Sequence, residues 1–446
     1  MCLAFDFFLS FSISLLFWGG CWCEYFIWSC INICVSFYFN RTLHLYITFL
    51  INRWLTYGYR KSGPMLAADN LKFSKIVKAA FAAKGLPPPL NAGPSSNQRQ
   101  DCDENIGNCP GWQPDGTANW ADWRWNDTVA FVEDAAASGS LDVVSWHWYS
   151  YYGCRNGTDQ YSCTPGLPLA KEALTTPSFL DRTGERAGRY ASLQQAAAPR
   201  AQNWLTATAS GGLGGIVNVS DAFASTLWML DSLGMLAAKQ THLVFRDEIF
   251  CGNNVAWNTN GKTLWHYAPY CIIRVEDDQR LTVKPDYFAI LLFKRLVGVD
   301  ALPATVEPGQ TFGESKLRAY SFKSKKSAVA GFGVGEGEQE GGVVTILINL
   351  GAQAINTTVT VGGGGGGGGV SGSNSDDLNQ RLVWHLAGVG GGRTTQALES
   401  SRVKINGNLM PNDGELPSEK EIAGVRTSGT DAVLLEPYSA AFIVDV

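Results

Sequence analysis

The stretch NWLTATASGGLGGIVNVSDAFASTLWMLDSLGMLAAKQTHLVFRDEIF, residues 203–250, decides the fold class of this chain. Its first seven residues fit a buried strand, the segment from Asp221 to Lys239 has the length and apolar content of a helix, and residues 241–250 fit a second strand. Glycine and other small residues separate the first strand from the helix. The order of strand, helix and strand predicts one unit of a parallel α/β sheet.

The same alternation continues on both sides of this stretch, over residues 64–299. Helical patterns occur at residues 67–85, 126–139, 169–174, 185–198 and 285–298, and strand patterns occur at residues 89–96 and 141–149. The segment LDVVSWHWY, residues 141–149, is apolar, β-branched and aromatic, as expected of a strand that is buried on both faces. Repeated units of this kind predict an α/β fold, a partial (β/α)8 TIM barrel.

The hydrophobic period changes to two after about residue 300. Short alternating segments such as LRAYSFK, GVVTILINLG and SAAFIVDV are separated by glycine-rich turns, which predicts a C-terminal all-β sandwich. The runs Gly362–Gly369 and Gly390–Gly392 lack the context of a phosphate-binding loop and favour flexible hairpin loops. We therefore divide the chain into a hydrophobic segment at 1–60, an incomplete barrel at 61–299 and a sandwich at 300–446.

The composition of the chain excludes one class of partner. Its 446 residues are 45% hydrophobic, and its 35 Lys and Arg against 40 Asp and Glu give a net charge of −5. A general nucleic-acid binder needs an excess of positive charge, so we expect no nucleic-acid partner. We also expect no cofactor and no metal ion.

The charges are distributed unevenly along the chain. Residues 1–52 contain Asp6, Glu24 and Arg41 as their formal charges, and the apolar runs between residues 7 and 39 are long enough for one tilted membrane span. A cleaved signal peptide fits less well, because an acidic residue stands where a positive leader is expected. An uncleaved signal, a misjudged gene start and a buried core helix are the alternatives for residues 1–60.

Cysteines and glycosylation motifs favour the secretory pathway. Cys102 with Cys109, and Cys154 with Cys163, are spaced for local disulfides, whereas pairing of Cys251 with Cys271 is less certain. Acceptor triplets for N-glycosylation occur at Asn40, Asn126, Asn156, Asn218 and Asn356. These features predict an extracellular, lysosomal or vacuolar, or membrane-anchored glycoprotein.

Chemistry in a barrel is expected at the carboxyl ends of the strands. One predicted strand ends in His147, Trp148 and Tyr149, an aromatic and hydrogen-bonding group of the kind that lines a sugar subsite, although His147 could equally be a core histidine. Another predicted strand ends in Arg246, Asp247 and Glu248.

Several separate segments together resemble one family. The segment SWHWYSYY, residues 204–250, KPDYFAILLFKRLVG and INGNLMPNDGELP occur in the order and spacing of the heparanase-like glycosidases of glycoside hydrolase family 79, and the resemblance covers roughly residues 65–446. It implies a (β/α)8 barrel with a C-terminal β-sandwich. It also implies retaining hydrolysis of β-glucuronide bonds in polysaccharides or proteoglycan glycans that contain uronic acid.

The residues depart from the family where its chemistry is carried out. A retaining glycosidase uses two carboxyl groups, one as the nucleophile and one as the general acid/base. The family motif Trp-Leu-Gly-Glu-Thr aligns with residues 204–208, and Ala207 stands where the nucleophilic Glu is expected. The family's Asn-Glu-Pro motif belongs upstream of residues 67–85, where this chain has its hydrophobic segment. The resemblance therefore predicts that half of the barrel is absent or replaced, and that no catalytic residue is intact.

Other family positions are retained. The resemblance assigns substrate contacts to His147, Tyr149, Gly214 and Gly215, and, with a less certain alignment, to Tyr270, which in the family hydrogen-bonds the nucleophile. Glu248 is a remote candidate for a replacement carboxylate. We expect a heparanase-like glycoside hydrolase that is inactive as written. The alternatives are a non-catalytic glycan-binding protein, using these residues and the tryptophans between Trp120 and Trp125, and a membrane-tethered glycoprotein.

Overall fold

The computed structural model describes residues 32–40, 42–50, 62–96, 124–152, 173–212, 215–252, 258–259, 262–263, 269–276, 278–306, 316–325, 342–360, 380–390, 395–415, 417–418 and 420–445. The chain divides into two compact units. Unit 1 contains Met1–Trp148, Arg186–Thr208 and Gln240–Phe245; unit 2 contains Tyr149–Glu185, Ala209–Lys239 and Arg246–Val446. The division at residues 60 and 299 remains a prediction, and the second of these boundaries falls inside a strand, β12 (Val297–Leu302).

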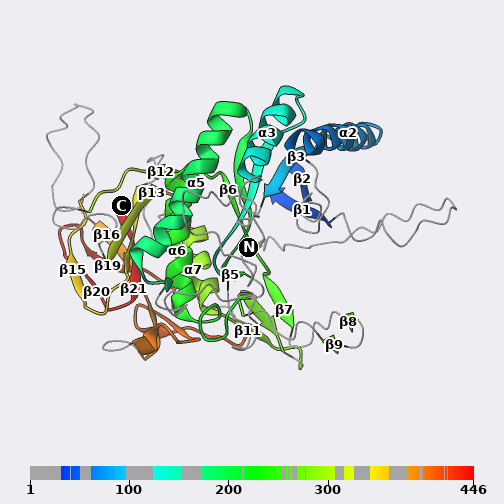
Figure 1. Cartoon of the computed structure of the whole chain (residues 1–446). Coiled ribbons are helices and arrows are strands. Elements are labelled where there is room, and N and C mark those ends of the chain that lie inside the picture. The colour runs from blue at the N-terminus through cyan, green and yellow to red at the C-terminus, as the bar shows by residue number, and fades with distance from the viewer. Residues whose placement is uncertain are drawn as a thin grey trace, which may run out of the picture. The chain divides into compact units, whose positions relative to one another are not determined.

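A six-stranded sheet in the order β1-β2-β3-β4-β5-β6 runs through unit 1 (Figure 1). Its strands are β1 (Asn32–Asn40), β2 (Thr42–Leu50), β3 (Leu90–Ser96), β4 (Val143–Tyr152), β5 (Gln202–Gly212) and β6 (Leu243–Arg246). β2 is parallel to β3, and β3 is parallel to β4. The helices between successive strands are α2 (Gly63–Ala82), α3 (Arg124–Ala137), α5 (Pro177–Ala197) and α6 (Phe223–Ala238). This order of strands and helices confirms the predicted partial α/β barrel.

The hydrophobic N-terminal segment contributes strands to this sheet. β1 and β2 form an antiparallel hairpin, and Tyr46, Ile47 and Thr48 of β2 pair with residues of β3. In the described part of the chain no helix is long and apolar enough to cross a membrane. A helical span reaching residue 39 was therefore wrong for residues 32–39, because short apolar runs rich in β-branched and aromatic residues fit strands as well as helices. Residues 7–31 lie outside the described residues.

The chain after residue 296 forms a second, mainly antiparallel sheet. Its eight strands are β12, β13 (Leu317–Ser324), β14 (Val343–Asn349), β21 (Ser439–Asp445), β16 (Gln380–Gly388), β17 (Val403–Ile405) and β18 (Asn408–Leu409), with β19 (Val425–Ser428) also paired to β16. Strands β15 (Ile355–Thr357) and β20 (Val433–Leu435) form a separate two-stranded sheet.

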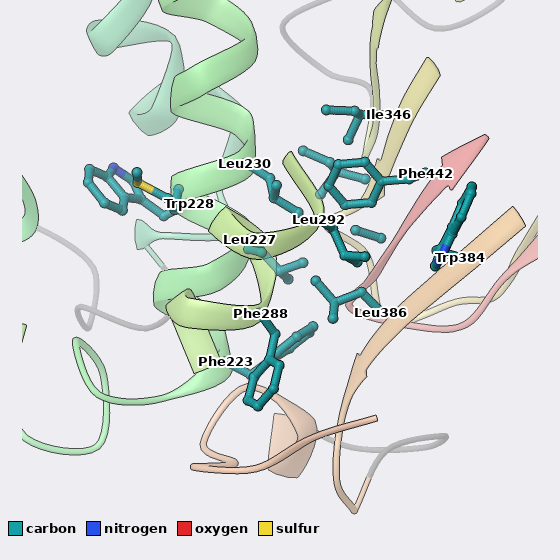
Figure 2. Close-up of a cluster of buried hydrophobic side chains, with 14 of the residues drawn as sticks. Phe223, Leu227, Trp228, Leu230, Phe288, Leu292, Ile346, Trp384, Leu386 and Phe442 are labelled. Carbon is teal, nitrogen blue, oxygen red and sulfur yellow. The ribbon is translucent and has the colours of Figure 1, made fainter. Parts of the chain in front are cut away.

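Both faces of the eight-stranded sheet are covered. On one face, Leu227 of α6 and Leu292 of α7 (Pro285–Leu296) lie in one buried cluster with Ile346, Leu386 and Phe442 of the sheet (Figure 2). On the other face, residues of β20 lie in a second cluster with residues of β13, β14 and β21. Successive side chains of a strand face opposite sides of the sheet, and successive residues of β14 such as Ile346 and Leu347 are apolar. Both faces of the sheet therefore carry apolar side chains that become buried. This arrangement is the predicted β-sandwich.

Short strands and one disulfide complete unit 2. β7 (Phe250–Gly252) pairs in parallel with β10 (Ile273–Val275), which pairs with β11 (Leu281–Val283); β8 (Asn258–Thr259) pairs with β9 (Lys262–Thr263). A disulfide joins Cys251 to Cys271, so this less certain pairing is confirmed. The predicted disulfides in residues 102–109 and 154–163 lie outside the described residues.

A buried charge cluster ties helices α5 and α6 to strand β13. Arg318 is 1% exposed and lies 2.6 Å from Asp181 of α5 and 3.6 Å from Asp231 of α6. The Tyr320 hydroxyl donates a 2.7 Å hydrogen bond to Asp231. Burial raises the pKa of Asp231 to about 6, despite the opposing effects of Arg318 and Tyr320. Desolvation of this carboxylate therefore outweighs its pairing.

The raised pKa of Asp231 predicts a pH dependence of stability. The folded state holds this proton more tightly than the unfolded state, so the contribution of Asp231 to the free energy of unfolding falls as the pH rises from about 4 through about 6. Between these pH values, the free energy of unfolding of the wild type should fall by about 3 kcal/mol relative to that of Asp231→Asn. Chemical denaturation at several pH values measures the difference. Asp300→Asn, at an exposed ion pair of β12, should follow the wild-type curve. Parallel curves for the wild type and Asp231→Asn would contradict the assignment.

Candidate functional site

The middle of β4, which continues to Tyr152 beyond its expected end at Tyr149, presents alternating side chains to opposite faces of the sheet. Trp146 stacks on Tyr190 of α5 with ring centroids 4.9 Å apart, and the Arg186 guanidinium of α5 lies 5.6 Å from the Trp148 ring. Because neighbouring residues of a strand face opposite sides, His147 and Tyr149 face away from this helix. In a barrel with its helices outside, that face points inward, and ligands bind where the strands reach their carboxyl ends.

His147 combines features of a core residue and a site residue. It is 7% exposed, and burial lowers its pKa to about 4, so the imidazole is neutral near pH 7. A neutral imidazole offers one donor and one acceptor to a partner. His147 belongs to unit 1, as does Ala207, whereas Tyr149, Asp247 and Tyr270 belong to unit 2.

The centre of the site in unit 2 is Asp247, which follows β6 directly. Its Oδ2 atom accepts a 2.8 Å hydrogen bond from the Tyr149 hydroxyl and a 3.1 Å hydrogen bond from the Tyr270 hydroxyl. Burial, together with the nearby Asp247 charge, raises the pKa of Tyr270 above its usual value, so this phenol remains a donor. Two residues that the resemblance assigned to substrate contact therefore meet on one carboxylate.

A buried ion pair fixes the end of β6 beside α7. Arg246 Nη2 lies 3.0 Å from Asp286 Oδ2 and also donates a 2.7 Å hydrogen bond to the Tyr270 carbonyl oxygen. The side chains of Arg246 and Asp286 are 6% and 4% exposed. Ser225 and Thr226 of α6 donate hydrogen bonds to the same carboxylate, which also lies in the first turn of α7, where the helix dipole favours negative charge.

Aromatic rings and the disulfide add further support around this pair. The Arg246 guanidinium lies 5.7 Å from the Trp228 ring centroid and 5.8 Å from that of Tyr270. Cys271 follows Tyr270 directly, and its disulfide with Cys251 connects this segment to β7, just after Asp247. The positions of Asp247 and Tyr270 are therefore held by an ion pair, a covalent link and the pairing of β7 with β10.

Gly215 lies next to Tyr270. Its φ angle is +85°, and an added Cβ would lie 2.7 Å from Ser220 Oγ and 3.1 Å from Tyr270 Cβ. A glycine is needed there both for the backbone conformation and for the close approach. Gly214 lies outside the described residues.

The predicted nucleophile position offers no carboxylate. Ala207 is a partly exposed residue of β5. Glu248 is exposed and adopts φ +50°, and its carboxylate accepts no hydrogen bond from the described residues. Partial desolvation and the adjacent Asp247 raise its pKa. Within the described ranges, no group of three or more His, Cys, Asp or Glu residues could hold a metal ion.

Sequence reasoning found Tyr149 and Tyr270 as candidates but missed the residue they share. The hydroxyl partners of Asp247 are 98 and 23 positions away in the chain, so spacing gave no signal. The signal that could have identified Asp247 was the pair of acidic residues directly after Arg246 at a predicted strand end. Of that pair we chose Glu248 as the candidate for a replacement carboxylate.

The ion pair of Arg246 predicts a large effect on stability. Arg246→Ala leaves Asp286 charged in a buried environment and should lower the free energy of unfolding by about 3–5 kcal/mol. Arg280→Ala, which breaks the fully exposed pair of Arg280 with Asp278, is the matched control and should remain close to the wild type. Chemical denaturation at pH 7 compares the two. Similar losses in the free energy of unfolding for both variants would show that the buried pair of Arg246 with Asp286 contributes no more to stability than an exposed pair.

The chain is similar in sequence to curated heparanase-like proteins. It is 23% identical over 322 residues to heparanase-like protein 3 of Arabidopsis thaliana, covering 69% of this chain and 50% of that protein. It is 27% identical over 168 residues to heparanase of Gallus gallus, covering 38% and 26%. It is 24% identical over 293 residues to inactive heparanase-2 of Homo sapiens, covering 64% and 40%. The chain thus spans half or less of the length of these relatives.

Solved structures give weaker likenesses. A 4-O-α-L-rhamnosyl-β-D-glucuronidase from Fusarium oxysporum matches with a TM-score of 0.48 and 12% identity, covering 87% of this chain and 66% of that one. A family 44 xyloglucanase from Paenibacillus polymyxa matches with a TM-score of 0.46 and 14% identity, covering 88% and 64%. No family model matches the chain. By its sequence relatives, the chain resembles the heparanase-like proteins, as its motifs predicted.

Proposed function

We propose that this chain is a heparanase-like glycoside hydrolase relative that binds glycans containing uronic acid and does not hydrolyse them by the retaining mechanism. The observation that carries the proposal is Ala207. Its methyl group cannot attack an anomeric carbon, so a glycosyl-enzyme intermediate cannot form at that position. One similar protein is itself named inactive heparanase-2, which supports a non-hydrolysing relative.

Glycan binding is supported by the groups that remain. The proposed substrate-binding residues are His147, Tyr149, Gly214, Gly215 and Tyr270. Sugars are bound by aromatic rings and by groups that exchange hydrogen bonds with hydroxyls. In unit 2 the two tyrosines supply both, and in unit 1 the neutral His147 supplies a donor and an acceptor. Gly215 supports the site from within, because its missing Cβ lets Ser220 and Tyr270 pack close to its backbone.

We further propose that the protein follows the secretory pathway, as a secreted, lysosomal or vacuolar glycoprotein or with a membrane anchor. The Cys251–Cys271 disulfide supports an oxidising compartment. Three of the predicted glycosylation acceptors, Asn126, Asn218 and Asn356, are exposed, which supports their accessibility. Membrane tethering rests on the apolar run in residues 7–31.

Binding and hydrolysis of one defined ligand test the proposed function. The ligand is an oligosaccharide of alternating glucuronate and N-acetylglucosamine, with binding followed by calorimetry and cleavage by chromatography of the products. The wild type should bind it and release no product. Tyr149→Phe should bind about fivefold to tenfold more weakly, because one hydroxyl that orders the site is lost.

The matched control is Tyr287→Phe on α7, where the ring packs edge-on against Phe288 and the hydroxyl has no partner among the described residues. This variant should bind like the wild type. Product release by the wild type would overturn the non-hydrolysing assignment. A wild type that binds no uronate-containing oligosaccharide would overturn the proposed function altogether.

A further inference from the structure

We propose that Asp247 determines the specificity of this site: it accepts hydrogen bonds from the hydroxyls of an uncharged sugar ring and disfavours a uronate ring in the same place. This inference rests on the proposed function, since it concerns the ring that a bound glycan places at Asp247. It narrows the ligand class to glycans in which uncharged rings alternate with the uronates, because such a chain can bind in a register that avoids two facing carboxylates.

The Asp247 carboxylate has a fixed orientation. One oxygen, Oδ2, accepts both tyrosine hydroxyls, from Tyr149 and Tyr270. Among the described residues, the other oxygen, Oδ1, accepts no hydrogen bond. Asp247 is partly exposed, so Oδ1 can meet a ligand. A carboxylate held by two donors loses little freedom when it accepts a hydroxyl, which favours binding.

A second feature is the charge at this end of β6. Arg246 is buried and paired with Asp286, so its charge is already compensated. Lys284 is 5% exposed, donates to the Pro269 carbonyl oxygen at 2.9 Å, and has a pKa lowered to about 8 by burial. The charged side chains next to Arg246 in the chain that reach solvent are therefore the acidic ones, Asp247 and Glu248.

These two features have a consequence for a ligand. A uronate carboxylate that approaches Asp247 meets a like charge, and the two described cations at this end of β6, Arg246 and Lys284, are already engaged. Such contacts discriminate between ligands by repulsion. An uncharged ring presents hydroxyl donors, which an ionised carboxylate accepts well. Tyr149 and Tyr270 direct their hydroxyl protons to Oδ2, so they strengthen Asp247 as a fixed anion and are not free to donate to a uronate.

The experiment compares two oligosaccharides of equal length by calorimetry. One alternates glucuronate with N-acetylglucosamine, and the other consists of β-linked glucuronate alone, so that every register places a uronate at Asp247. The wild type should bind the all-glucuronate probe at least about tenfold more weakly. Asp247→Asn keeps an acceptor for the tyrosines. In this variant the affinities for the two probes should differ by no more than about threefold, mainly because the affinity for the all-glucuronate probe increases.

The control variant is Asp278→Asn, which removes an exposed carboxylate of the same net charge at the turn before β11 and should leave the tenfold gap unchanged. Raising the salt concentration should narrow the gap in the wild type, because screening weakens repulsion. This measurement needs no variant, so it stands even if Asp247→Asn folds poorly.

The outcomes separate the two proposals. Equal binding of both probes by the wild type, or a gap that Asp247→Asn and salt leave unchanged, overturns the role of Asp247 while glycan binding stands. Binding of neither probe by the wild type overturns the proposed function itself.

Discussion

The buried pair between Arg246 and Asp286 is the interaction on which the rest of the site depends. It joins the end of β6 to the first turn of α7, and through Ser225 and Thr226 it also fixes α6. Since Arg246 holds the Tyr270 carbonyl oxygen as well, the same guanidinium sets where Tyr270 and Asp247 can meet. A charge pair with so little exposure contributes mainly by fixing one arrangement, because desolvation offsets much of its attraction.

The proposed function separates recognition from catalysis. In this proposal Ala207 stands where the resemblance expects the nucleophile, whereas the two tyrosines assigned to substrate contact converge on Asp247. The carboxylate that the tyrosines share belongs to Asp247, directly after β6.

Much of the fold could be predicted from periodicity. The strand predicted at residues 141–149 is β4, and the helix predicted at residues 285–298 is α7. Both predictions succeeded because the local sequence pattern of each segment agrees with its place in the fold. The N-terminal run was misread where it forms β1, since an apolar segment that short carries no distinguishing period. The site was predicted by residue type for Tyr149 and Tyr270, but Asp247 emerged because its partners come together through tertiary structure.

The proposed function implies most directly that the wild type forms no covalent intermediate with a glycan. Incubation with a 2-deoxy-2-fluoro-β-glucuronide carrying a good leaving group traps the intermediate of a retaining glycosidase, and intact-protein mass spectrometry detects it. The account predicts an unchanged mass for the wild type at all reagent concentrations that saturate binding. A stoichiometric increase equal to one fluoroglucuronyl group, mapped to Asp247, Glu248 or any other carboxylate, would contradict it.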